Sequence, residues 1–152
     1  MLLKPINFSV MTSLWFVLLI LGGCSAEVEE NSTYTVSNAS IRTPAPGRTM
    51  TAGYFEFTNN SAEAVTIIAV RSSAAERIEM HTVLKVDDQM RMRPLPELTV
   101  PAGETAIFTS GGNHLMLFGI ELSDAATILE IELDNGTVVA APFQSTALNQ
   151  TN

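Results

Sequence analysis

The sequence is poor in cysteine, histidine and basic residues. Its 152 residues include one Cys, two His and eight Lys or Arg against sixteen Asp or Glu, which gives a formal net charge of -8. A single Cys excludes an intramolecular disulfide and any zinc or iron–sulfur site built from several thiolates of one chain. The shortage of Lys and Arg argues against nucleic-acid binding, which needs clustered cations. The length fits one domain that can fold without disulfides.

Motifs of the common enzyme classes are also missing. The sequence contains no Gly-rich phosphate loop, no His-Glu-x-x-His and no Gly-x-Ser-x-Gly. A nucleophilic triad is hard to assemble from two His and a single Cys that lies near the N-terminus. The acidic residues could supply a carboxylate pair, but their context singles none out. We therefore expect a protein that is not an enzyme.

The N-terminus resembles a bacterial lipoprotein signal. An apolar stretch at 10–23 follows a single Lys and is shorter than the roughly 20 residues of a membrane-spanning helix. It ends in Leu-Gly-Gly-Cys, which resembles the lipobox whose Cys is lipidated and becomes the first residue of the mature protein. We expect a signal peptide at 1–23 and a lipid anchor on Cys24. An ordinary signal cleaved near Ala26 and an uncleaved anchor are the alternatives.

Both ends of the mature chain are expected to be flexible. Residues 24–33 are rich in Glu and are interpreted as an acidic tether between the anchor and the domain, and residues 144–152 as a flexible tail. A lipid anchor would hold the protein on the membrane surface without a spanning helix. The domain would then lie in the periplasm or another extracytoplasmic space.

Beyond residue 33 the sequence has the pattern of β-strands. Short runs rich in Val, Ile, Thr, Phe and Tyr are separated by Gly, Pro, Asn and Asp, and no helical period lasts beyond about two turns. A helical turn at 74–79 is the one alternative. The spacing predicts a single all-β domain at 34–143, an antiparallel sandwich or barrel. The predicted strands lie near 34–42, 52–58, 64–72, 77–85, 89–94, 105–109, 113–120, 127–133 and 137–143.

The two His and most Met residues of the domain are close together in the sequence. Both His and four of the five Met beyond Cys24 lie between residues 80 and 116, and Met50 is the exception. Side chains alternate between the faces of a strand, so His114 and Met116 share one face. Met90 and Met92 likewise share a face.

The hairpin that carries Met92 has two candidate registers. A turn centred on Val86-Asp87 places His81 directly opposite Met92. A turn centred on Asp87-Asp88 makes them diagonal neighbours, ~7–8 Å apart. Either register brings an imidazole and a thioether together at one end of the sheet, and a third strand bearing His114 and Met116 could complete the set.

This combination of side chains favours a soft metal ion. Thioether sulfur is neutral and polarizable and suits Cu(I), whereas Zn, Mg and Ca prefer thiolate, more imidazole or carboxylate. A blue-copper site is disfavoured because it needs a Cys within the domain. Packing is the competing interpretation of any single Met. Met80 is expected in the core, because its side chain points away from that of His81, and Met90 is not expected to bind metal.

Four of these residues follow the pattern H-x10-M-x21-H-x-M, namely His81, Met92, His114 and Met116. Together with Met-Arg-Met-Arg-Pro at 90–94 and Gly-Gly-Asn-His-Leu-Met at 111–116, they give a sequence that resembles the periplasmic copper chaperones known as PCu(A)C, over roughly residues 34–143. The resemblance implies a cupredoxin-like Greek-key β-sandwich with a solvent-exposed Cu(I) site formed by those four side chains. It also implies copper delivery to extracytoplasmic acceptors, chiefly cytochrome c oxidase or its assembly factors.

The leading hypothesis is therefore a monomeric, membrane-tethered Cu(I) carrier. Imidazoles bind metal only when neutral, so we expect the affinity to fall as the pH drops through the ordinary imidazole range, ~6.5. A copper-buffering or copper-resistance lipoprotein without a dedicated partner needs the same ligands and is the alternative. A purely structural β-sandwich lipoprotein is the third hypothesis.

Overall fold

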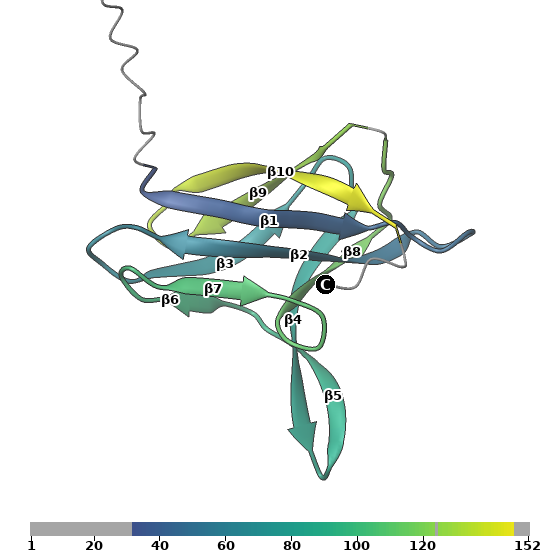
Figure 1. The fold of residues 1–152 in the computed structure, drawn as a ribbon, viewed down its shortest axis with the longest axis horizontal. Helices are drawn as coiled ribbons and strands as arrows, with labels where there is room; N and C mark the ends of the chain where they lie inside the picture. Colours follow the sequence, from purple (N-terminus) through teal and green to yellow (C-terminus); the bar gives the residue numbers. More distant parts are fainter. Residues whose placement is uncertain (1–31, 124, 148–152) are drawn as a thin grey trace, which may run out of the picture. The chain divides into compact units, whose positions relative to one another are not determined.

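The computed structural model describes residues 32–123 and 125–147, which form ten β-strands (Figure 1). The nine predicted strands are all present, to within three residues at each end. The tenth, β6, has three residues, too few to show an alternating pattern in the sequence. The strands are β1 (Tyr34–Arg42), β2 (Met50–Asn59), β3 (Val65–Arg71), β4 (Arg77–Val86), β5 (Gln89–Pro94), β6 (Leu98–Val100), β7 (Thr105–Phe108), β8 (His114–Phe118), β9 (Thr127–Leu133) and β10 (Val138–Thr146).

The bounds of the strands test several predictions made from the sequence. β4 begins at Arg77, and the described residues contain no helix, so the helical alternative at 74–79 is wrong. β10 continues to Thr146, three residues past the predicted end of the domain. The predicted signal peptide, Cys24 and most of the tether and tail lie outside the described residues. Within the described part, no helix has the length and apolar character needed to cross a membrane.

The strands form one folded, open sheet in the order β5-β4-β8-β2-β1-β10-β9-β3-β6, with β7 also paired to β2. Each half of this sheet is antiparallel. β1 and β10, which join the halves, run parallel, so the expectation of a purely antiparallel sheet is wrong at this pair. In this pair the last strand of the domain lies beside the first, and both run in the same direction. β5 and β6 remain as edges, and the architecture is a sandwich, not a closed barrel.

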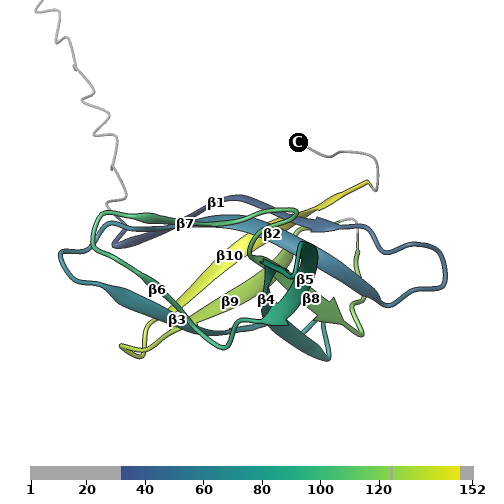
Figure 2. The ribbon, with the colours of Figure 1, turned by 90° about the horizontal axis from the view of Figure 1, so that it is seen from below.

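The core lies between the two halves of the sheet. Figure 2 shows β1 and β2 above β3 and β9. Alternate residues of β2 and β9 are buried, as expected for strands with one face on a core. The rings of Phe55 on β2 and Phe143 on β10 meet edge to face with centroids 5.5 Å apart. Met80 is buried in this core, as predicted.

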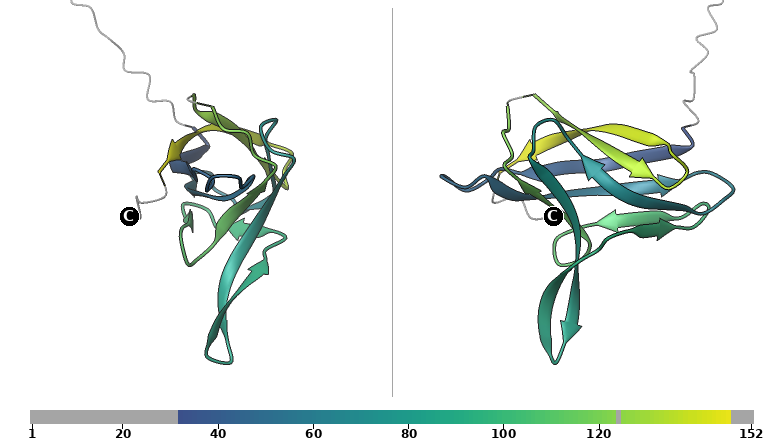
Figure 3. Two further views of the ribbon diagram at one scale, coloured as in Figure 1. Left: turned by 90° about the vertical axis from the view of Figure 1, so that its right-hand side faces the viewer. Right: turned by 180° about the vertical axis from the view of Figure 1, so that it is seen from behind.

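The β4–β5 hairpin extends away from the sandwich, as both views in Figure 3 show. Every residue of β5 is exposed, and β5 pairs only with β4. Asp87 and Asp88 form the two-residue turn with φ of 50° and 61°, and Val86 pairs with Gln89. Positive φ at both turn residues matches the right-handed twist of a hairpin. The second of the two predicted registers is therefore the correct one.

Asn59, the last residue of β2, connects the β2–β3 loop with the residues that end and follow β6. Its side chain is buried, and its Nδ2 lies 2.8, 3.0 and 3.2 Å from the carbonyl oxygens of Glu63, Val100 and Pro101. Its Oδ1 accepts a hydrogen bond from the backbone N–H of Ser61. One amide thus satisfies backbone groups that would otherwise be buried without partners.

Asn59→Ala is expected to lower the free energy of unfolding by roughly 2–4 kcal/mol, because each buried polar group left unpaired costs about 1–3 kcal/mol. Urea denaturation of the full chain measures this. Asn60→Ala is the matched control, since the two side-chain hydrogen bonds of Asn60 are exposed and should matter little. Equal losses in the two variants would contradict the assigned role of Asn59.

Candidate metal centre

The pairing of β4 with β8 places the two histidines side by side. His81 and His114 are direct partners in the register of these strands. Their ring centroids are 6.0 Å apart, and the ring planes are inclined by 48°. His114 is buried, and the side chain of His81 is 14% exposed. The site therefore begins with two largely desolvated imidazoles on one face of the sheet.

Each imidazole is oriented by a hydrogen bond through one ring nitrogen. His81 Nε2 lies 2.9 Å from Glu79 Oε2, and His114 Nδ1 lies 3.0 Å from the Gly112 carbonyl oxygen. A carboxylate and a carbonyl only accept hydrogen bonds, so these ring nitrogens carry the protons. In the neutral rings the lone pairs are then on His81 Nδ1 and His114 Nε2. Both of these nitrogens are buried and have no hydrogen-bond partner among the described residues.

Met92 and Met116 lie on the same face as the histidines. Met92 pairs with Val83 and is a diagonal neighbour of His81 across the hairpin, and Met116 follows His114 by two residues on β8. Met92 and Met116 line a cavity of about 380 Å³ together with His114. All four sequence-predicted site residues are thus gathered at one end of the sheet.

The remaining methionines near the site differ in exposure. Met80 faces the core, so it points away from the histidines. Met90 lies on the same face of β5 as Met92 and pairs with Lys85 nearer the tip of the hairpin, where it is 64% exposed. Met90 therefore does not fill a gap in the core. Met50, at the start of β2, is exposed and lines the same cavity as Met92 and Met116.

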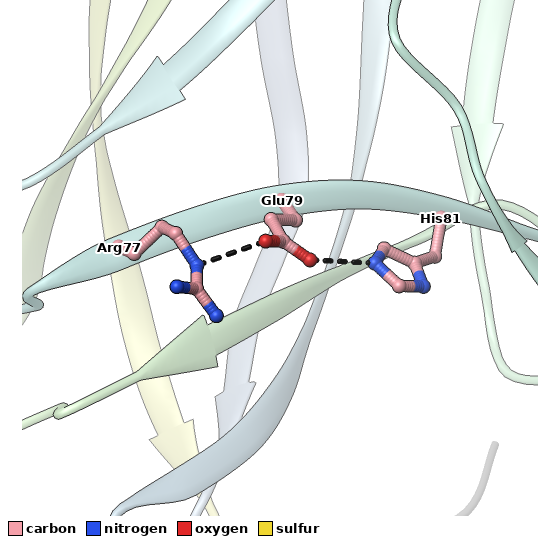
Figure 4. Close-up of polar contacts among 3 residues, drawn as sticks. All are labelled: Arg77, Glu79 and His81. Carbon is pink, nitrogen blue, oxygen red and sulfur yellow. Dashed lines mark hydrogen bonds and ion pairs between the residues drawn. The ribbon is translucent and has the colours of Figure 1, made fainter.

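Three side chains on one face of β4 form a short polar chain, which Figure 4 shows. Arg77 Nε lies 2.8 Å from Glu79 Oε1, and the other carboxylate oxygen accepts the hydrogen bond from His81. The hydrogen bond from His81 lowers the pKa of Glu79, partial desolvation opposes this, and the charge of Arg77 lowers the pKa further. Glu79 is therefore ionised at neutral pH and remains an acceptor for His81.

Glu79 and Gly112 belong to the site but were not predicted from the sequence. Glu79 precedes His81 by two residues on a strand, so the period-two alternation alone could have placed both on one face. The carbonyl of Gly112 carried no such signal, because its direction depends on the conformation of the loop before β8. Arg42 and Arg48 also line the cavity, and they come from the distant β1–β2 region.

The fold is shared with solved PCuAC domains. The copper-bound PCuAC domain from PmoF2 superposes with a TM-score of 0.63 at 16% identity, covering 76% of this chain and 94% of that domain. Apo-DR1885 from Deinococcus radiodurans superposes with a TM-score of 0.58 at 21% identity, covering 79% of this chain and 83% of that one. These matches confirm the predicted cupredoxin-like all-β fold.

The sequence matches the LpqE-like lipoprotein family over residues 34–141, and the chain belongs to that family. The match spans all strands up to the middle of β10 and includes all four candidate site residues. The Leifsonia xyli subsp. xyli (strain CTCB07) protein named "Putative lipoprotein Lxx21020" is 28% identical over 119 residues, covering 72% of this chain and 70% of that protein.

The hydrogen bond between His81 and Glu79 predicts a measurable titration. Carbon-13 NMR of the Glu79 carboxyl group should give a pKa below the ordinary glutamate value, and His81→Ala should raise it by removing the largest cause of the shift. Arg77→Ala should raise it less. Because the pKa is lowered in the folded state, the contact stabilises the fold above the ordinary glutamate pKa and is lost as the pH falls through the lowered value. An unchanged Glu79 pKa in His81→Ala would contradict this account.

Proposed function

We propose that this protein is an extracytoplasmic copper chaperone that carries one Cu(I) ion on His81, Met92, His114 and Met116. The observation that carries the proposal is the pair of buried ring nitrogens, His81 Nδ1 and His114 Nε2, which have no hydrogen-bond partner among the described residues. Leaving a polar atom buried and unpaired costs about 1–3 kcal/mol. A metal ion bound by both nitrogens would offset that cost.

The chemistry of the side chains favours Cu(I). Two neutral imidazoles and two thioethers form a soft donor set, and neutral sulfur suits a polarizable monovalent ion. Metal-binding histidines usually donate the other ring N–H to a carboxylate or carbonyl, which fixes the tautomer and the ring orientation. Glu79 and the Gly112 carbonyl supply these two acceptors.

Solved relatives of the fold support copper as the cargo. The PCuAC domain from PmoF2 was solved with copper bound, and DR1885 was solved as its CuI form, which matches this chain with a TM-score of 0.58 at 20% identity. The likeness covers 76% of this chain in each case. Together with the four side chains at one end of the sheet, it favours a copper-binding role over a purely structural one.

The exposure of the ligands favours carriage over storage. Met92 is 48% exposed on a strand that pairs only with its hairpin partner, whereas His114 is buried in the sandwich. Met92 can therefore leave the metal first and open a coordination position to an incoming ligand. The exchange involves no bond-making chemistry on an organic substrate, and the protein acts as a carrier, not as an enzyme.

Membership in a lipoprotein family supports the rest of the proposal. Residues 1–23 would be a lipoprotein signal peptide, Cys24 the lipidated residue and 24–33 a tether. The copper-binding domain would run from residue 34 to the end of β10 at Thr146, and the rest of the chain would be a tail. Lipidation would hold the monomeric domain at the periplasmic or outer surface of the membrane. Acceptors would then be membrane-bound copper proteins, such as cytochrome c oxidase or its assembly factors.

The ligand assignment is tested by Cu(I) titration of the protein against a competing chelator. His114→Ala and Met92→Ala are each expected to weaken Cu(I) binding by on the order of tenfold or more, where a factor of ten corresponds to about 1.4 kcal/mol. Met90→Ala is the matched control, because Met90 is on the same strand and face as Met92 but nearer the tip. It should bind as tightly as the wild type.

Two results would reject the assignment. Unchanged affinity in both ligand variants would place the metal elsewhere, and equal losses in Met92→Ala and Met90→Ala would remove the distinction between ligand and neighbour. Absence of stoichiometric Cu(I) binding by the wild type would favour the purely structural alternative.

A deletion strain separates delivery from buffering. Delivery predicts lower activity of a copper-containing respiratory oxidase, restored by added copper, because the acceptor then fills without the carrier. Copper sensitivity with normal oxidase activity would instead identify a copper-buffering lipoprotein. If the same site is responsible, complementation with Met92→Ala should rescue neither the oxidase defect nor the copper sensitivity.

A further inference from the structure

The cavity at the candidate metal centre has a charge opposite to that of the chain as a whole. The sequence carries twice as many acidic as basic residues, yet no Asp or Glu is among the described residues that line this cavity, whereas Arg42 and Arg48 are. Arg91 and Arg93, which flank Met92 along β5, lie on the opposite face of the hairpin and do not line the cavity. We call Arg42 and Arg48 the cationic rim.

The arginines of the cationic rim form no ion pair within the described part of the chain. Among the described residues, the arginines in ion pairs are Arg71 and Arg77, neither of which belongs to the rim. The guanidinium of Arg42 lies over the ring of Tyr54, 5.7 Å from its centroid, a contact that positions the charge without neutralising it.

Exposed apolar side chains accompany the rim. Met50 and Met92 line the same cavity, and Met90 is exposed on the same face of the adjoining hairpin. Exposed Met and Arg together are the composition of a protein-binding surface, because these residue types are enriched at interfaces whereas Lys, Glu and Asp are depleted. A small anion would need only the positive charge. This surface also offers apolar area, which a protein partner can contact.

We propose that the cationic rim is the docking surface for an acidic face of the protein that accepts copper. This inference rests on the proposed function, because it concerns the partner of that same site. Opposite charges on the two surfaces would speed their encounter and orient the acceptor's ligands toward Met92, the exposed thioether. Copper stays Cu(I) throughout: bonds to this protein's ligands break as bonds to the acceptor form, and an acceptor thiol releases its proton to solvent.

Two synthetic acceptors that differ only in charge test the proposal. Each is a Cys-x-x-Cys peptide, flanked by Glu residues in one and by Gln residues in the other. The full chain in an uncharged detergent is loaded with Cu(I), and the second-order rate of transfer to each peptide is measured by stopped flow. The quantity of interest is the ratio of the two rates, in which any change in Cu(I) affinity cancels.

The wild type is expected to transfer copper to the Glu peptide on the order of tenfold faster at low ionic strength. Added salt should bring the ratio toward one. Arg48→Gln should lower the ratio, and Arg42→Gln with Arg48→Gln should lower it further. Arg71→Gln is the charge-matched control for Arg48→Gln, since Arg71 lies on β3 and pairs with Glu132. It should keep the wild-type ratio.

A ratio near one in the wild type would overturn the proposal, as would equal losses in Arg48→Gln and Arg71→Gln, which would reduce the effect to net charge. These outcomes are separate from failure of the proposed function, which would appear earlier as absence of stoichiometric Cu(I) loading. Circular dichroism of each variant identifies any loss of folding.

Discussion

The candidate metal centre depends on the alignment of β4 with β8. This register sets His81 opposite His114, and both imidazoles are largely shielded from water. Backbone hydrogen bonds along the ladder fix the alignment, and the buried neighbours Met80 and Leu115, paired on the core side, oppose any slip. The packing that stabilises the sandwich therefore also fixes the positions of the histidines.

The site combines a rigid part and an exposed part. β8 lies between β4 and β2 and holds His114 and Met116 against the sandwich. Among the described strands β5 pairs with β4 alone, and every residue of β5, Met92 included, is exposed. Segments with few buried contacts open more easily than core strands. In the proposed function, β8 would retain the metal ion and β5 would release it.

Local patterns predicted most of the fold but only part of the site. Alternating residues identified nine strands, and Asp87-Asp88 limited the hairpin to two registers that both bring Met92 near His81. The pairing of β4 with β8 is non-local, and no pattern in either strand specifies it. The parallel β1–β10 pair was missed for the same reason. Glu79 was recoverable from its spacing to His81, whereas Arg42 and Arg48 reach the cavity only through the tertiary fold.

The two-residue turn of the β4–β5 hairpin has a consequence for how this site can vary. Successive side chains of β5 point to opposite faces, so Met90 and Met92 lie on one face and Arg91 and Arg93 on the other. A shift of β5 by one residue against β4 would invert the strand and put a cation where Met92 now lies. Every proposed ligand would still be present in the sequence. The register that this turn sets is thus as much a part of the candidate site as the identity of the side chains.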